Sequence, residues 1–195
     1  MTDAALAAEA TRRRLTPRQA AVVERIIEAA AEEARDTGYE GATVRTAAKR
    51  AGVAIATAYT YFASKDHLLA EVMWRRMEAL PELEHDPDAT PMERLRAELS
   101  VVGLFMADDT RLAVACTTAL LGSGPEVFSL RERFGAELHS RVATALGAGA
   151  DPRVLQGIDM ALSGAMLWAG MGHMSFAQVP DVLSQTAQLL LEGAR

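Results

Sequence analysis

The chain has 195 residues, of which 50% are hydrophobic and 5% aromatic, and its formal net charge is −6. This length allows one large domain or two small ones, and the abundance of Ala, Leu, Glu and Arg favours helices over sheets. The single cysteine, Cys116, excludes an internal disulfide and a cysteine-based zinc cluster, so a reducing cytoplasm is the expected location. Neither a secretory signal nor an apolar run long enough to cross a bilayer is found, so we expect no membrane association.

The charge is unevenly distributed along the sequence. Residues 1–67 hold ten Lys or Arg and nine Asp or Glu, whereas residues 68–195 hold ten and seventeen. The segment 43–65 contains no acidic residue and four cations, which are Arg45, Lys49, Arg50 and Lys65. Because salt screens the attraction to phosphate within about 10 Å, a local patch indicates an anionic partner better than the total charge does. A solvated face of an ordinary domain is the alternative.

Capping residues and glycines predict three helices in the first 63 residues. Thr16, followed by Pro17 and then by Gln19, forms a capping box, and Gly38 and Gly52 are the expected stops of the first and second helices. The predicted helices run from Thr16 to Gly38, from Val44 to Ala51 after a Thr43 cap, and from about Ala54 to Phe62. Two helices joined by a tight turn at a glycine are typical of a helix-turn-helix, whose second helix enters the DNA major groove.

Six further helices are predicted after residue 63, and no strand pattern competes with them. They are expected over Lys65 to about Leu80, Thr90 to about Ala107, Thr110 to Leu121, Pro125 to about Leu146, Asp151 to His173, and Val179 to Glu192. We therefore expect an all-α protein with a small N-terminal part, residues 1–63, and a larger helical body, residues 64–195. The helix that starts at Lys65 adjoins both parts.

The third predicted helix has one face to bury and one to expose. Ala58 and Phe62 lie four residues apart and, together with Ile55, should pack on the first two helices. The residues off this stripe are Thr57, Tyr59, Thr60 and Tyr61. An exposed tyrosine can donate to a phosphate oxygen or a base edge, and its ring can contact a thymine methyl group. For Tyr61 a buried position is the alternative.

Residues 38–69, GYEGATVRTAAKRAGVAIATAYTYFASKDHLL, resemble the DNA-binding domain of the tetracycline-repressor (TetR) family. The pattern of that family is a Gly-aromatic pair, Thr-x-x-x-Ile-Ala, Ala-Gly-Val-Ser, a small residue and Thr-Leu-Tyr-x-Tyr-Phe, and Lys-x-x-Leu. The resemblance implies phosphate contacts by Thr43, Thr57, Tyr61 and Lys65, base-edge contacts by Ile55, Ala56 and Tyr59, and a further DNA contact by Arg45. Together with Thr60, which is expected on the exposed side of the third helix, these residues make up the expected DNA-binding site.

The sequence departs from the family pattern at four alanines. Ala47 and Ala58 replace larger residues, so the core of the small domain should be thin. Ala54 replaces the usual Ser and removes an N-cap hydroxyl that is worth about 1 kcal/mol. Because Ala56 stands where Gly is common and Ile55 lies beside it, hydrogen-bonded base readout should be sparse, and thymine-methyl contacts and DNA shape should carry more of the specificity.

An arginine triplet precedes the first helix. Arg12, Arg13 and Arg14 could extend into a flanking minor groove, as basic arms do. A solvated terminus without a DNA contact is the alternative.

The resemblance also implies that the body is a ligand-binding and dimerisation domain, in which the last two helices of two subunits form a four-helix bundle. The eighth predicted helix is rich in glycine, which permits close helix approach although each Gly lowers helix stability by about 1 kcal/mol relative to Ala. The last helix has an apolar face, formed by Val179, Val182, Leu183, Leu189 and Leu190. Burial of that face within one subunit is the alternative to burial between two.

The body contains candidates for an effector pocket, although ordinary core packing is the alternative for each of them. They are Phe105, Met106, Cys116, Phe128, Phe134, Met166, Trp168 and Met171. Their apolar, Met-rich character favours a small hydrophobic effector such as a fatty acyl chain, a sterol or a lipophilic drug.

The sequence thus predicts a cytoplasmic homodimer that binds a palindromic double-stranded DNA operator and acts as a ligand-responsive repressor. An enzyme is the rival class, but the four histidines and Cys116 match no catalytic or metal-binding spacing, so we expect no catalysis, cofactor or metal site. A helical protein–protein adaptor is the second rival, and the acid-free segment 43–65 argues against it.

Overall fold

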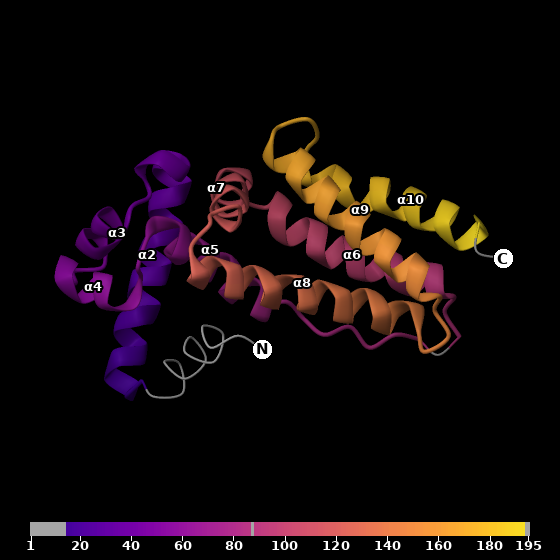
Figure 1. Cartoon of the computed structure of the whole chain (residues 1–195), viewed down its shortest axis with the longest axis horizontal. Coiled ribbons are helices and arrows are strands. Elements are labelled where there is room, and N and C mark those ends of the chain that lie inside the picture. The colour runs from indigo at the N-terminus through magenta and orange to yellow at the C-terminus, as the bar shows by residue number, and fades with distance from the viewer. Residues whose placement is uncertain (1–14, 87, 194–195) are drawn as a thin grey trace. The chain divides into compact units, whose positions relative to one another are not determined.

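The computed structural model describes residues 15–86 and 88–193, and all regular secondary structure in these ranges is helical (Figure 1). The helices, labelled as in Figure 1, are α2 (Pro17–Gly41), α3 (Val44–Arg50), α4 (Ile55–Tyr61), α5 (Lys65–Glu78), α6 (Pro91–Ala107), α7 (Thr110–Leu120), α8 (Pro125–Leu146), α9 (Pro152–Gly170), the 3₁₀ helix η1 (Phe176–Gln178) and α10 (Val179–Gly193). The predicted all-α fold is therefore confirmed.

The helices form two compact units. The first comprises Met1–Glu78 and Arg111–Arg133, and the second comprises Ala79–Thr110 and Phe134–Arg195. The first unit thus includes α5, α7 and the start of α8 as well as the predicted helix-turn-helix. The division after residue 63 between DNA-binding and ligand-binding domains stays a prediction about function.

Helix starts follow from local capping, as the sequence predicts. The hydroxyl groups of Thr16 and Thr90 accept a hydrogen bond from the backbone three residues later, and the side chain of Asp151 caps α9. Gly38 interrupts α2 with a φ of +71°, a backbone conformation that a residue with a side chain rarely adopts. One more turn follows it and ends at Gly41.

The first unit has a small core of alanines and short aliphatic side chains. Ile26 and Ala34 of α2 and Ala47 of α3 are fully buried, which lets these helix backbones approach closely. Ala58 and Phe62 dock α4, as predicted, and burial of a side chain such as Phe62 is worth about 1.5–3 kcal/mol. The large, fully buried side chains of this unit include Ile26 of α2 and Leu112 of α7, and α5 contributes Leu68, Leu69, Met73 and Met77.

In the second unit α10 packs between α6 and α9, and small residues set the spacing. A Cβ atom on Gly103 would collide with the ring of Pro180, and one on Gly157 would lie 3.0 Å from Leu190 Cδ1. Two of the apolar residues on α10, Val179 and Leu183, are buried within the chain, so the predicted apolar face is not uniformly available to a second subunit.

No single helix in the described ranges is long and apolar enough to cross a membrane. The helices Thr110–Leu120 and Pro125–Leu146 reach that length and composition only when taken together, and they are bent by 116°.

Candidate nucleic-acid interface

Helix α4 carries six of the nine residues predicted to contact DNA, and its exposed face presents four of them. Ala56, Thr57 and Thr60 are exposed, and Tyr59 has 52% of its surface accessible. The hydroxyl of Thr60 donates to the carbonyl oxygen of Ala56 at 3.1 Å, so its hydrogen is already used within the helix. The two residues of α4 that are half-buried are Ile55 and Tyr61.

The start of α4 lacks a side-chain cap. Ala54 occupies the N-cap position and makes no side-chain hydrogen bond there, as its identity predicts. The helix is only seven residues long, so its position depends on the docking of Ala58 and Phe62.

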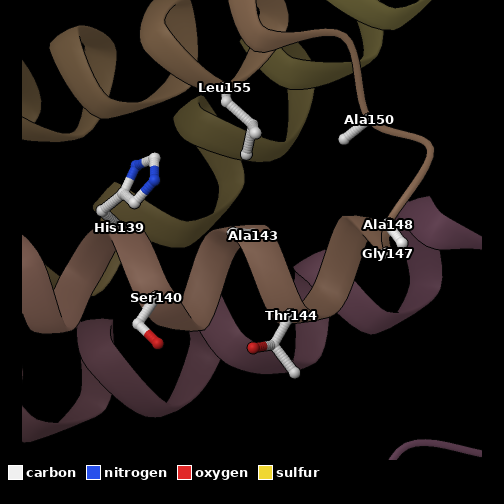
Figure 2. Close-up of a pocket in the computed structure, with 8 residues that line it drawn as sticks. All are labelled: His139, Ser140, Ala143, Thr144, Gly147, Ala148, Ala150 and Leu155. Atoms are coloured by element: carbon white, nitrogen blue, oxygen red, sulfur yellow. The ribbon is translucent and has the colours of Figure 1, made fainter.

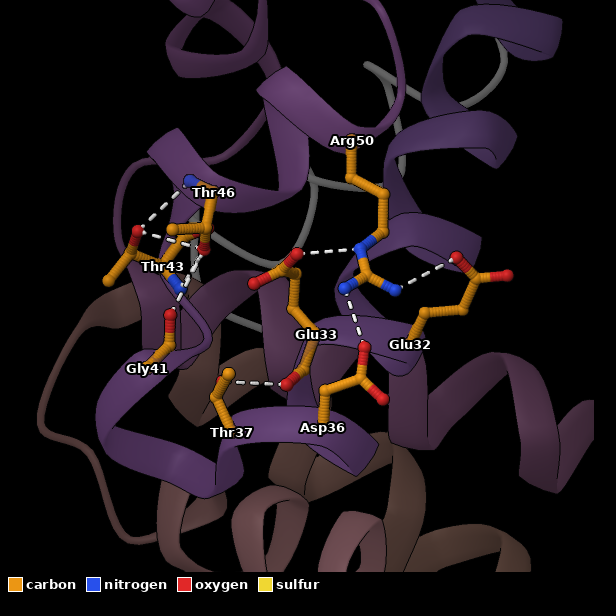
Figure 3. Close-up of polar contacts among 8 residues, drawn as sticks. All are labelled: Glu32, Glu33, Asp36, Thr37, Gly41, Thr43, Thr46 and Arg50. Atoms are coloured by element: carbon orange, nitrogen blue, oxygen red, sulfur yellow. Dashed lines mark hydrogen bonds and ion pairs between the residues drawn. The ribbon is translucent and has the colours of Figure 1, made fainter.

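The start of α3 is capped by two threonines (Figure 3). The backbone N–H of Thr46 donates to Thr43 Oγ1 at 3.1 Å, and the backbone N–H of Thr43 donates to Thr46 Oγ1 at 2.9 Å. Thr43 therefore has a structural role in addition to its predicted phosphate contact. On the outer face of α3, Arg45 and Lys49 lie four residues apart, and neither forms an ion pair within the described ranges.

Arg50 is held by α2 rather than presented to a partner. Its guanidinium group lies 2.6 Å from Glu33 Oε1, 2.6 Å from Asp36 Oδ2 and 3.4 Å from Glu32 Oε2 (Figure 3). These hydrogen bonds, first that to Asp36, raise the pKa of Arg50 above its usual range. The prediction of an unpaired cationic patch is therefore wrong at Arg50, because three carboxylates of the same unit neutralise its charge.

Lys65 and Asp66 at the start of α5 contact the last turn of α2. Tyr39 donates its hydroxyl hydrogen to Asp66 Oδ1 at 2.6 Å, and this hydrogen bond raises the pKa of Tyr39 to about 12. Lys65 Nζ lies 3.7 Å from the centre of the Tyr39 ring, 3.4 Å from the Tyr39 carbonyl oxygen and 3.6 Å from Glu40 Oε2. We call these four residues the α2–α5 clamp.

Two contacts from later in the chain support this arrangement within the first unit. Arg111 of α7 donates to the carbonyl oxygens of Arg35 and Asp36 at 3.2 and 2.8 Å, next to the Gly38 interruption of α2. A Cβ atom on Gly122, in the α7–α8 connection, would lie 2.9 Å from Asp66 Oδ2. The sequence contains no signal for either contact, because both depend on segments far apart along the chain.

His67 connects the end of α4 to the start of α5. The backbone N–H of Ala63 donates to His67 Nδ1 at 3.2 Å, and the imidazole ring packs edge-on against Phe62 with 5.6 Å between ring centres. Burial lowers the pKa of His67, although the nearby carboxylates of Glu71 and Glu126 oppose that effect. The neutral ring is therefore the form that fits this junction.

The eight residues predicted to line an effector pocket are divided between the two units. Cys116 and Phe128 belong to the first unit and the remaining six to the second. The buried members are Phe105, Met106, Cys116, Phe134 and Met166, whereas the exposed ones are Phe128, Trp168 and Met171. The exposed three are surface residues of the single chain, and the pocket stays a prediction.

An open hollow of about 560 Å³ lies in the second unit, between the end of α8 and the start of α9 (Figure 2). Figure 2 shows the side chains of His139 and Leu155 on the side of α8 that faces α9, whereas those of Ser140 and Thr144 point to the opposite side. His139 Nδ1 lies 2.7 Å from Asp159 Oδ2 and joins the two helices. None of the predicted pocket residues lines this hollow.

In the described part of the first unit, two buried side-chain polar atoms have no hydrogen-bond partner. They are the indole Nε1 of Trp74 on α5 and the hydroxyl Oγ1 of Thr117 on α7. Buried polar groups are rarely unpaired, so each is a candidate to bind a polar group of a ligand or a water molecule. Neither atom could be predicted from the sequence, because a buried polar group without a partner leaves no sequence pattern.

Exposed apolar residues, called the apolar stripe below, lie on α9 and on α10, the orange and yellow helices that lie side by side in Figure 1. It consists of Met160, Gly164 and Trp168 on α9, which recur every four residues, of Met171 directly after α9, and of Val182 and Leu189 on α10. Trp168 is 59% exposed and Leu189 is 71% exposed. An apolar surface of this kind is typical of a protein–protein interface.

The predicted minor-groove arm, Arg12 to Arg14, lies outside the described residues. Within the described ranges no three histidine, cysteine or carboxylate side chains are grouped so as to hold a metal ion.

Comparison with known proteins shows the family to which the chain belongs. Residues 26–72 match the model of the bacterial regulatory proteins, tetR family. The uncharacterized HTH-type transcriptional regulator Rv0767c of Mycobacterium tuberculosis (strain ATCC 25618 / H37Rv) is 40% identical over 179 residues, covering 91% of this chain and 84% of that protein. The HTH-type transcriptional repressor KstR of Rhodococcus jostii (strain RHA1) is 30% identical over 178 residues, covering 88% and 84%.

A solved structure shows the same fold. The transcriptional regulator FadR from Bacillus subtilis, in complex with stearoyl-CoA, superposes with a TM-score of 0.59 at 23% identity and covers 87% of this chain and 98% of that one. The fold, the helix-turn-helix and the relatives together define a DNA-binding transcriptional regulator. The chain belongs to the TetR family of bacterial regulatory proteins.

The lowered pKa of His67 predicts a pH dependence of stability. Because its pKa is lower in the folded chain than its ordinary value near 6.5, the unfolded chain binds more protons around pH 6. The free energy of unfolding should therefore rise from pH 5 to about 7.5. A His67→Asn variant keeps an acceptor for Ala63 but does not titrate, so denaturant unfolding should show a smaller rise. An equal rise in both proteins would exclude this role of His67.

Proposed function

We propose that this protein is a ligand-responsive repressor that binds a palindromic operator as a homodimer. The observation that carries the proposal is the exposed face of α4, with Tyr59 outward and Ala58 and Phe62 docked, in a chain of the TetR family. In this proposal Tyr59, Ile55 and Ala56 meet base edges in the major groove. The phosphate contacts come from Thr43, Arg45, Thr57, Tyr61 and Lys65, and the exposed Lys49 joins them.

The homodimer is proposed from the apolar stripe on α9 and α10. A two-fold axis would bring the same stripe of each subunit together, which is the usual geometry of a soluble homodimer. Gly164 supports this use, because a Cβ atom there would meet no described part of the chain within 4 Å apart from the adjacent backbone of α9. Two recognition helices related by that axis would read the two halves of a palindrome.

The proposed effector is a small hydrophobic molecule of the fatty acyl, sterol or lipophilic drug type. Phe105, Met106, Phe134 and Met166 supply buried apolar surface in the second unit, and methionine adapts readily to ligand shape. Support also comes from the FadR structure, which contains stearoyl-CoA. The relative KstR is named a transcriptional repressor, and this supports repression as the mode of action.

Release from DNA would be a shift in population between two states of the dimer. The effector would favour the state in which the two recognition helices no longer fit successive major grooves. In this mechanism α5 carries the change to the helix-turn-helix through the α2–α5 clamp. No catalytic step is proposed, and the relatives reported above are transcriptional regulators.

DNA selection tests the proposal directly. Duplexes recovered from a random pool by the full chain should converge on a two-fold symmetric site. Tyr59→Ala should then weaken binding to the recovered site by about tenfold or more, while its binding to a random duplex of equal length should change little. Fluorescence anisotropy measures both, and Tyr59→Phe separates the hydroxyl from the ring. Recovery of no preferred sequence, or equal losses on both duplexes, would overturn the assignment of Tyr59.

The dimer interface can be broken by charge. Leu189→Glu and Trp168→Glu should each shift the protein from dimer to monomer in analytical ultracentrifugation, because each places a charge in an apolar interface. Leu104→Glu is the matched control, since Leu104 is 60% exposed on α6 and lies off the stripe. A wild-type monomer, or dimers that persist in both stripe variants, would show that the stripe is not the interface.

The effector class can be tested by competition. Stearoyl-CoA should raise the Kd of the wild-type protein for the recovered duplex, whereas coenzyme A without the acyl chain should not. A sterol and a lipophilic drug form parallel arms of the same titration. Absence of any change with all three hydrophobic probes would contradict the proposed class, and release by coenzyme A alone would point to a polar effector.

A further inference from the structure

Lys65 makes three contacts with residues of α2. Its ammonium lies over the Tyr39 ring and next to the Tyr39 carbonyl oxygen, so two contacts already fix it against α2. A third contact, Glu40 Oε2 at 3.6 Å, is different in kind, because it places a full negative charge beside the ammonium. A DNA phosphate bound to Lys65 would therefore lie close to the carboxylate of Glu40.

The burial of the two side chains argues against a structural purpose for this ion pair. The side chain of Glu40 is 91% exposed, and an ion pair with so exposed a partner contributes little to folding. Lys65 is mostly buried, with 28% of its side chain accessible, and would stay in place through Tyr39 if Glu40 were neutral. The position of Lys65 therefore does not need the Glu40 charge.

The charge does have an electrostatic consequence for binding. A phosphate approaching Lys65 meets the negative charge of Glu40, and two like charges a few ångströms apart repel each other even in water. Such a charge at the rim of a binding surface acts on every duplex, because phosphates carry no sequence information.

We infer that Glu40 is a built-in competitor for DNA phosphate at Lys65, which lowers the affinity for all duplexes alike and leaves discrimination to α4. This inference rests on the proposed phosphate contact of Lys65. Its effect is to keep absolute affinity low, so that a modest effector-induced change is enough to release the operator.

The test compares Glu40→Gln, Lys65→Ala and the double variant with the wild-type full chain, by anisotropy on the selected and the random duplex. Glu40→Gln should tighten binding to both by about three- to tenfold at low salt. The gain should shrink as salt rises, with a salt slope steeper by up to about one. Glu132→Gln removes the same charge from an exposed position of α8 in the same unit and should change little.

The variants separate the possible failures. If Lys65→Ala leaves binding to every duplex unchanged, the proposed phosphate contact is wrong and the inference falls with it. If Lys65→Ala weakens binding but Glu40→Gln does not tighten it, the phosphate contact stands and the role of Glu40 is wrong. A full Glu40→Gln gain in the Lys65→Ala background would also overturn the inference, because the two effects should be non-additive. Thermal unfolding of Glu40→Gln should match the wild type, which a structural role would not allow.

Discussion

The hydrogen bond from Tyr39 to Asp66 joins the end of α2 to the start of α5, and the position of Lys65 on the predicted DNA-binding surface depends on this junction. The chain reaches this geometry only because Gly38 adopts a positive φ and redirects the last turn of α2. Gly41 must also lack a side chain, since a Cβ there would collide with Thr37. Two glycines thus allow a tyrosine to reach a carboxylate, and the ring of that tyrosine then positions Lys65.

Much of this fold could be predicted because helix boundaries are set locally. A threonine followed three residues later by Gln, Thr or Glu caps α2, α3 and α6, and such a signal needs no knowledge of the tertiary structure. The exposed face of α4 was predictable for the same reason, since a helix docked by Ala58 and Phe62 has one outward side. The residue roles on that face stay predictions.

Pairings between distant segments could not be predicted. The sequence shows Arg50 as one of four cations in an acid-free segment, yet Glu32, Glu33 and Asp36 reach it from α2. Similarly, periodicity marks α9 as apolar without showing that Ile158 and Leu162 turn inward while Trp168 and Met171 face outward. A helix that is apolar on two sides has one side for its own chain and one for a partner, and only the packed structure distinguishes them.

The missing N-cap of α4 has a consequence for the dynamics of the free protein. A seven-residue helix with alanine at its N-cap and two docking side chains has little local free energy to hold its amides against solvent. Its backbone hydrogens should exchange faster than those of α2, and DNA would slow them by supplying the contacts that the helix lacks. Ordering of α4 then becomes part of the binding reaction. A DNA sequence that fits poorly therefore binds more weakly for two reasons: it makes fewer contacts, and it leaves α4 less ordered.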